Sequence, residues 1–350
     1  MKTKVLKVDP HFPEASDIEK AAQALQAGQR VAFPTETVYG LGANALDSEA
    51  VKKIFAAKGR PAHDPLIVHI SDLRMLDQVV SQVSEEALKL ARRFWPGPLT
   101  LIMPRHANIP GEVTAGLGSV AVRMPSHPVA LALIRQAGIP VAAPSANRFG
   151  HTSPTSAAHV LADLDGRIEM VLDGGSTPIG VESTVLDVTQ SPARILRPGG
   201  VSYEALQESL GTVLLNGQKT SGEEDHPQIS PGLLSRHYAP KAVLVLFESE
   251  GDQKICEEMR QKVELLLSQG KRVGVMCAVE DRPFFDGLEV DLRLLGSVDR
   301  LEDIARGLYL ALRSLDEAGV DFIVAREFGS QGIGLAIQDR LRRAATHKEE

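Results

Sequence analysis

The chain has 350 residues, of which 43% are hydrophobic and 24% are charged. This length predicts more than one domain, and the composition excludes a disordered or collagen-like chain. A formal net charge of −7 and few aromatic residues (10 Phe, 4 Tyr and 1 Trp) argue against a protein whose main role is to bind nucleic acid. Only two cysteines occur, which predicts neither a disulfide framework nor a cysteine-bound metal.

The first 211 residues alternate helical and extended patterns, which predicts a single α/β domain. Apolar residues on one helical face after Ser16 predict a first helix, and Arg30–Phe33 predict the strand that follows it. Further strands are expected at residues 66–70, 99–103, 119–123, 141–143, 169–172 and 183–188, and helices near 48–58, 84–94, 128–137 and 155–164. Their ends are rich in Gly, Pro, Ser and Thr, so we expect a ligand site at the strand ends.

Residues 212–240 break this periodicity with mixed Gly, Ser, Pro and charged residues, which predicts a linker. The alternation resumes in residues 241–350. Strands are expected at 243–247, 272–276 and 321–325, and helices up to 269, over 301–315 and through 337–341. This pattern favours a second, smaller Rossmann-like α/β domain. No apolar run approaches the ~18 residues of a membrane span and the N-terminus lacks a signal-peptide pattern, so we expect a cytoplasmic protein without membrane contact.

Several polar stretches are candidates for a site. The first is PTETVYGLG at residues 34–42, interpreted as a polar loop after a strand. Lys58 and Arg60 follow a helix, where basic residues can also serve only to oppose the helix dipole. Ser119 and Arg123 lie four residues apart on one strand and therefore share a face. The remaining stretches are APSAN at 143–147, SPT at 153–155, VESTV at 181–185 and RPG at 197–199.

These stretches supply four cations, Lys58, Arg60, Arg123 and Arg197, a set that suits a phosphate or carboxylate ligand. The sequence contains no P-loop, kinase, GxSxG or HExxH motif. Any ATP site must therefore be built in another way.

The motifs PTETVYGLG, KGRP with DPLIVHI, WPGPLT, SVAVRMPSHP, APSAN, SPT, ESTV and RPGG occur in this order, and in this the chain resembles the YrdC-like family. The SPGLLSRHYAP segment and the C-terminal domain are similar to those of its long form, the two-domain threonylcarbamoyl-AMP synthases. The resemblance implies a twisted open sheet with flanking helices in the first domain. It also implies a nucleotidyltransferase that makes L-threonylcarbamoyl-AMP and diphosphate from L-threonine, bicarbonate and ATP, the first step toward threonylcarbamoyladenosine in tRNA. Mg²⁺ would accompany ATP without a dedicated protein cage.

The same resemblance assigns the site residues, with Lys58 and Arg60 as the catalytic pair. The positions that match ATP contacts are Lys58, Arg60, Asp64, Ser119, Ser145, Asn147, Ser153, Arg197 and Tyr238. Those that match threonine contacts are Thr37, His69, Arg123, Ala143 through its backbone, and Ser183. Asp64 departs from the family's usual Asn, and its carboxylate would repel phosphates unless Mg²⁺ or an arginine intervenes. Tyr238 lies in the 212–240 linker, which the resemblance implies is a lid over the site.

Two other functions are consistent with a YrdC-like domain. An RNA-binding module would use a basic concave surface, but the near-neutral first domain and scarce aromatics count against it. A carbamoyltransferase of the hydrogenase-maturation type would bring cysteine-rich zinc modules, which a chain with two cysteines lacks. The synthase is therefore the favoured interpretation, with its product passed to the machinery that modifies tRNA and with room for a weak contact with tRNA itself.

Overall fold

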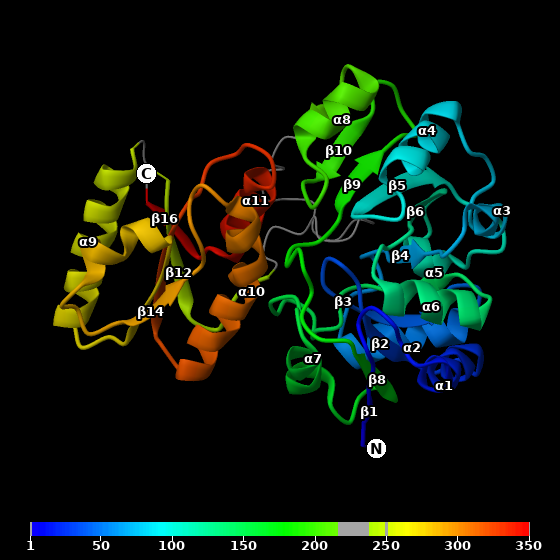
Figure 1. The fold of residues 1–350 in the computed structure, drawn as a ribbon, viewed down its shortest axis with the longest axis horizontal. Helices are drawn as coiled ribbons and strands as arrows, with labels where there is room; N and C mark the ends of the chain where they lie inside the picture. Colours follow the sequence, from blue (N-terminus) through cyan, green and yellow to red (C-terminus); the bar gives the residue numbers. More distant parts are fainter. Residues whose placement is uncertain (1, 216–237, 249–250, 350) are drawn as a thin grey trace. The chain divides into compact units, whose positions relative to one another are not determined.

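The computed structural model describes residues 2–215, 238–248 and 251–349 (Figure 1). They form two compact units. The first contains the described residues of Met1–Phe149, Ser153–Pro178 and Glu182–Ser235, and the second those of Gly150–Thr152, Ile179–Val181 and Arg236–Glu350. Both are α/β structures, which confirms the expected fold class.

The first unit is built on an 11-stranded sheet that mixes parallel and antiparallel pairs. The strand order is β1-β8-β2-β3-β7-β4-β6-β5-β9-β10-β11. The strands are β1 (Lys4–Lys7), β2 (Val31–Pro34), β3 (Tyr39–Asn44), β4 (Ile67–His69), β5 (Leu99–Pro104), β6 (Ser119–Arg123), β7 (Val141–Ala142), β8 (Met170–Asp173), β9 (Thr184–Asp187), β10 (Arg194–Arg197) and β11 (Leu214–Leu215).

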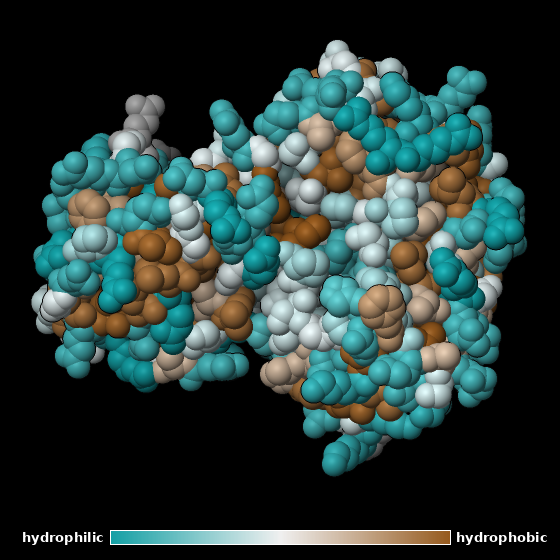
Figure 2. Space-filling model, viewed as in Figure 1, coloured by the Kyte–Doolittle hydropathy of each residue, from teal (hydrophilic) through white to brown (hydrophobic). Residues whose placement is uncertain are grey.

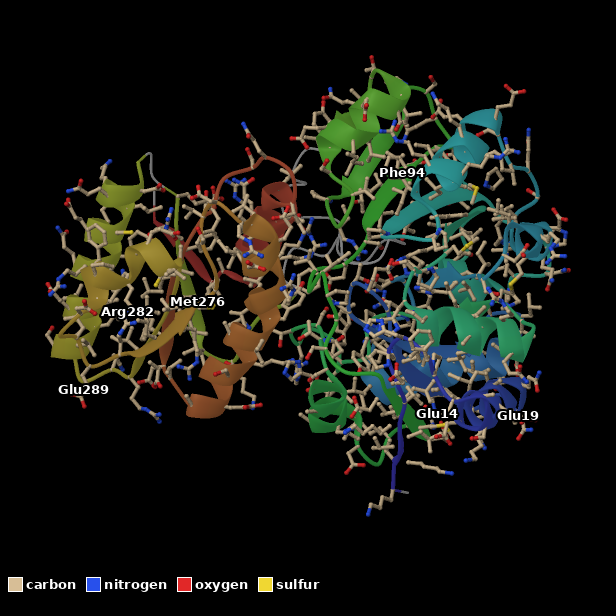
Figure 3. The ribbon with its side chains drawn as sticks, viewed as in Figure 1. Glu14, Glu19, Phe94, Met276, Arg282 and Glu289 are labelled. Atoms are coloured by element: carbon tan, nitrogen blue, oxygen red, sulfur yellow. The ribbon has the colours of Figure 1, made fainter. Side chains whose placement is uncertain are left out.

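Helices cover the two faces of this sheet unequally. On one face α1 and α6 pack over β1, β2 and β8, and on the other α2, α4, α7 and α8 bury a larger core that runs across most of the strands. Phe94, at the end of α4, is labelled in Figure 3. The helices are α1 (Ala15–Gln26), α2 (Ser48–Lys58), α3 (Leu76–Val79), α4 (Glu85–Phe94), α5 (Gly111–Thr114), α6 (Pro128–Ala137), α7 (Ala157–Leu164) and α8 (Tyr203–Leu210), with a 3₁₀ turn, η1, at Leu73–Met75.

The structure corrects the interpretation of residues 34–42 as a loop. Tyr39–Asn44 form β3, which pairs antiparallel with β2 through a turn of only four residues, 35–38. Glycine is disfavoured inside strands, and this preference made the stretch resemble a loop. At Gly42, however, a Cβ would lie 2.7 Å from Cε1 of Phe33 and 2.8 Å from Cγ1 of Val141. The glycine is therefore required for close packing inside the sheet.

The second unit contains a five-stranded parallel sheet in the order β14-β13-β15-β12-β16. In a Rossmann sheet the first two strands in the sequence are neighbours. Here the first two strands of the unit, β12 and β13, are separated by β15. The apolar face of α9 packs on one side of the sheet. The elements are β12 (Val243–Phe247), α9 (Asp252–Ser268), β13 (Val273–Cys277), the 3₁₀ segment η2 (Val279–Phe285), β14 (Asp291–Leu294), α10 (Leu301–Ala318), β15 (Phe322–Arg326), α11 (Gly334–Ala344) and β16 (His347–Glu349).

The surfaces of both units carry many hydrophilic residues on the face shown in Figure 2. Within the described ranges, none of the helices combines the length and the apolar character needed to cross a membrane.

Candidate active site

The candidate site lies on one face of strands β4 and β6, which pair in parallel with Ile67 opposite Ala121 and His69 opposite Arg123. Side chains alternate along a strand, so these four share a face with Ser119, while the intervening valines point into the main core. The middle of this face is apolar and is formed by Ile67, Ile102, Ala121, Val185 and Leu196. The face thus has an apolar centre between two polar ends, each about 7 Å away at 3.3 Å per residue.

Arg123 is buried at the carboxyl end of β6 and is held by the β2–β3 turn. Its Nη1 donates to Oγ1 of Thr37 at 2.9 Å, and its Nη2 lies 2.7 Å from Oε1 of Glu36. Its Nε donates to the carbonyl of Gly97 at 3.3 Å. The turn therefore brings a hydroxyl and a carboxylate onto a guanidinium that comes from a strand far away in the sequence.

His69 is buried beside Arg123 and has no charged partner of its own among the described residues. Its Nδ1 lies 3.2 Å from the carbonyl oxygen of Ile67, which also accepts the N–H of Ala143 at 2.9 Å. Burial and, to a smaller extent, the charge of Arg123 lower the pKa of His69 to about 3. At neutral pH the ring is therefore uncharged and can hydrogen-bond a neutral group. The N–H of Ala143 is therefore already engaged within the sheet.

At the other end, helix α2 finishes at Lys58 and the chain turns through Gly59, whose φ of 65° is left-handed. The Nζ of Lys58 donates to the carbonyls of Ser145 and Asn147 at 2.5 and 2.6 Å. Burial, followed by the charge of Arg60, lowers the pKa of Lys58 well below its usual value. Lys58 thus faces the 145–147 loop and does more than oppose the dipole of its own helix.

Arg60 forms a buried ion pair with Asp64, with Nη2 2.8 Å from Oδ1. Arg60 also donates to the backbone carbonyls of Asp64 at 3.0 Å and Pro65 at 2.7 Å, just before β4 begins. Burial raises the pKa of Asp64, while Arg60 and Lys58 act in the opposite direction. Of the two groups that could keep this carboxylate from repelling phosphates, Mg²⁺ or an arginine, the arginine is present.

Arg197 is held against the Ser183 segment by a close backbone approach. Its Nη2 donates to the carbonyl of Ser183 at 3.0 Å and lies 3.3 Å from Oγ of the same residue. The Ser183 hydroxyl is 2.8 Å from Oγ1 of Thr100. A Cβ at Gly199 would lie 2.3 Å from Ser183 C and Thr184 N, so only glycine fits against the backbone of these two residues.

Two further predicted residues lie in different surroundings. The hydroxyl of Ser153 donates to Oε1 of Glu182 at 2.5 Å, and both side chains are buried. Tyr238 belongs to the second unit, where its ring lies 5.7 Å from that of Tyr309 and the guanidinium of Arg340 lies 5.1 Å above it. Most of the predicted lid, residues 216–237, lies outside the described residues.

Sequence reasoning did not select three polar residues that the structure places among the candidates: Glu36, Thr100 and Glu182. The two acids lie in stretches that the sequence singles out, but a carboxylate is an unfavourable neighbour for a phosphate ligand. Thr100 lies inside a predicted strand and gives no local signal. Across the described part of the chain, no three His, Cys, Asp or Glu side chains are grouped as a metal site would require.

The comparisons with known proteins match most of the chain. A model of the Sua5/YciO/YrdC family, described as telomere recombination, matches residues 23–199. A model described as threonylcarbamoyl-AMP synthase, C-terminal domain, matches residues 201–346.

Individual relatives agree with these family models. A threonylcarbamoyl-AMP synthase of Pyrococcus abyssi is 46% identical over 331 residues, which cover 95% of this chain and 94% of the relative. That of Bacillus subtilis is 47% identical over 333 residues, covering 94% and 92%. The crystal structure of P. abyssi Sua5 complexed with L-threonine superposes with a TM-score of 0.92 at 44% identity and covers 99% of this chain and 100% of the neighbour. The chain therefore belongs to the threonylcarbamoyl-AMP synthases, a family of nucleotidyltransferase-type enzymes.

Proposed function

We propose that this chain forms L-threonylcarbamoyl-AMP and diphosphate from L-threonine, bicarbonate and ATP, the first step toward threonylcarbamoyladenosine in tRNA. The observation that carries the proposal is the sheet face with two polar ends. One end groups Arg123, Thr37 and His69, and the other groups Lys58 and Arg60. A reaction that joins an amino acid to a nucleotide needs two such subsites on one surface, so that the reacting atoms of the two substrates can meet between them.

The Arg123 end is the proposed threonine subsite. Arg123 would bind the α-carboxylate, a pairing for which guanidinium geometry is suited. The neutral ring of His69 and the hydroxyls of Thr37 and Ser183 are available for the threonine hydroxyl. Ala143, whose N–H donates to the carbonyl of Ile67, is the further proposed threonine contact through its backbone.

The Lys58 end is the proposed nucleotide subsite, where Lys58 and Arg60 would neutralise the triphosphate. Mg²⁺ would enter with ATP as part of the substrate and offset the negative charge of its phosphates. Asp64 is already paired with Arg60 and would not repel the nucleotide as an isolated carboxylate would. Further ATP contacts are proposed for Ser119, Ser145, Asn147, Ser153, Arg197 and Tyr238.

The chemistry requires no covalent intermediate on the protein. The threonine amine, after losing its ammonium proton to solvent, takes up CO₂ from bicarbonate to give a carbamate and water. A carbamate oxygen then displaces diphosphate from the α-phosphorus of ATP. Positioning of the two substrates and stabilisation of the charge on the phosphates supply the rate enhancement. Lys58 and Arg60 are the proposed catalytic residues because their charges lie where phosphate charge would develop.

The product would pass to the machinery that transfers the threonylcarbamoyl group to tRNA. A main role in RNA binding, or as a carbamoyltransferase, is not favoured, since relatives that match this chain over most of its length are named as synthases.

The test is to incubate the full chain with ATP, Mg²⁺, bicarbonate and labelled threonine and to look for a labelled adenylate. We expect the adenylate only when all components are present, with one diphosphate released per product. Diphosphate release that does not depend on threonine, or no adenylate with intact ATP and threonine binding, would refute the proposal.

A further inference from the structure

Glu36 is a buried carboxylate that neither the sequence nor the proposed function assigns. Its side chain is 6% exposed, and neither of its carboxylate oxygens accepts a hydrogen bond from a described residue. Its one close charged contact among those residues is with Arg123, at 2.7 Å from Oε1. Burial of a charged carboxylate without hydrogen bonds is unfavourable unless a positive charge compensates it. Oε2 of Glu36 has no hydrogen-bond partner in the described part of the chain, and this needs an explanation.

The turn that carries Glu36 does not need this side chain. The hydroxyl of Thr35 accepts the N–H groups of Thr37 and Val38 and donates to the Val38 carbonyl at 2.7 Å. The ladder pair Pro34 and Tyr39 closes the hairpin. Because the turn is satisfied by its own backbone and by Thr35, a structural role for the carboxylate as a cap is not supported.

The charges around Glu36 define what could compensate it. Arg123 and Glu36 together are neutral, so a ligand with a single negative charge would leave an unbalanced charge in a buried site. The charge of Glu36 also acts on His127, and burial lowers the pKa of His127 despite the opposing effect of Glu36. His127 therefore does not supply a positive charge at neutral pH. A ligand that carries one negative and one positive group would balance the site.

We propose that Glu36 receives the α-ammonium of the amino acid substrate, so that the Arg123–Glu36 pair recognises a zwitterion and selects α-amino acids over α-hydroxy acids. The inference rests on the proposed function, which places the α-carboxylate at Arg123. Both charged groups of an amino acid are attached to one carbon, and the two opposite charges of the protein pair lie within 2.7 Å of each other. The carboxylate of the bound amino acid would bind Arg123, and its ammonium would bind the carboxylate of Glu36. Glu36 is thus a specificity-determining residue.

The experiment compares the binding of two ligands to the full chain by calorimetry at neutral pH: L-threonine and 2,3-dihydroxybutanoate, in which a hydroxyl replaces the α-ammonium. The variants are Glu36→Gln, which keeps the size and an acceptor for Arg123 but removes the charge, and Glu36→Asp, which keeps the charge. The control is Glu169→Gln, the same change at a partly buried glutamate that pairs with Arg30 at 2.5 Å. Fluorescence of Trp95 verifies that each variant is folded, and ATP binding is measured in parallel.

The unsubstituted chain should bind threonine at least about tenfold more tightly than the hydroxy acid, because a hydroxyl cannot balance a buried carboxylate. Glu36→Gln should weaken threonine binding by about tenfold or more, leave the hydroxy acid within about threefold, and preserve ATP binding. Glu36→Asp should retain part of the preference for threonine, and Glu169→Gln all of it.

Equal weakening of both ligands in Glu36→Gln, or an unchanged preference for threonine, would overturn the inference. Failure of the unsubstituted chain to bind threonine would overturn the proposed function as well. The two failures are therefore distinguishable.

Discussion

Substitution of His69 by Asn should remove a specific part of the pH dependence of stability. His69 is buried next to Arg123, and the pKa of its ring is about 3 in the folded protein. In the unfolded chain a histidine titrates near its ordinary value of about 6.5. Above that pH the ring is neutral in both states and contributes no pH dependence.

As the pH falls from about 6.5 to 3, the unfolded chain binds a proton at His69 that the folded protein does not bind. The free energy of unfolding therefore decreases with falling pH, by about 1.4 kcal/mol per pH unit from this residue. Because pH 5 lies about 1.5 units below the pKa of the unfolded histidine, the free energy of unfolding there is about 2 kcal/mol lower than at pH 7. His69→Asn changes the stability at neutral pH as well, but that offset is constant with pH and does not enter the slope.

Urea unfolding followed by tryptophan fluorescence measures this slope in the first unit alone. Trp95 is the single tryptophan of the chain, and its buried indole donates to the carbonyl of Leu99 at 2.7 Å. Between pH 7 and pH 5 the unsubstituted chain should lose about 2 kcal/mol more free energy of unfolding than His69→Asn loses. Replacement of the exposed His11 by Asn is the matched control for a histidine outside the site. Parallel curves for His69→Asn would refute the assignment of a neutral buried ring.

Two further predictions concern the ends of the site. Gly199→Ala should lower the free energy of unfolding of the first unit by about 1 to 3 kcal/mol, because its Cβ would lie within 2.4 Å of three backbone atoms. Gly111→Ala, whose Cβ would have no neighbour closer than 3.9 Å, should change it little, and equal effects would contradict the packing argument. Lys58→Ala should reduce adenylate formation on the order of 10²-fold or more while Trp95 fluorescence still shows a folded unit. Near-normal turnover would exclude Lys58 from the triphosphate subsite.

Much of the fold follows from local signals in the sequence. Helix α2 begins where Asp47 caps the N–H groups of Glu49 and Ala50, and α6 has Pro128 at its start and a left-handed Gly138 after its end. These signals fix the helix limits independently of the rest of the chain. Strand β3 could not be predicted in the same way. Its glycines are required only because residues outside β3 pack closely against them, and this packing is not visible in the local sequence.

The sequence singles out residue types for the candidate site but not the contacts between them. Lys58 and Arg60 stand out in the sequence because cations and glycine are grouped at a helix end. The contact between Glu36 and Arg123 joins residues 87 apart in the sequence and depends on which strands pair. The sheet mixes parallel and antiparallel strands, so the polar residues lie at both ends of β4 and β6 and not at one carboxyl edge, as an open parallel sheet would have them.

Two cations of the site, Arg60 and Arg123, form buried ion pairs before any ligand binds, and this affects how a truncation must be interpreted. Arg60→Ala would remove the partner of Asp64, whose side chain is fully buried, and loss of one member of a buried ion pair destabilises a protein by about 3 to 5 kcal/mol. Loss of activity in that variant alone would therefore not separate a role in phosphate binding from unfolding. In Arg60→Ala combined with Asp64→Asn, no charge is left unpaired, and most of the lost stability should return. Adenylate formation should stay absent, because the cation is still missing. Recovery of both stability and synthesis in the double variant would show that Arg60 serves only to neutralise Asp64.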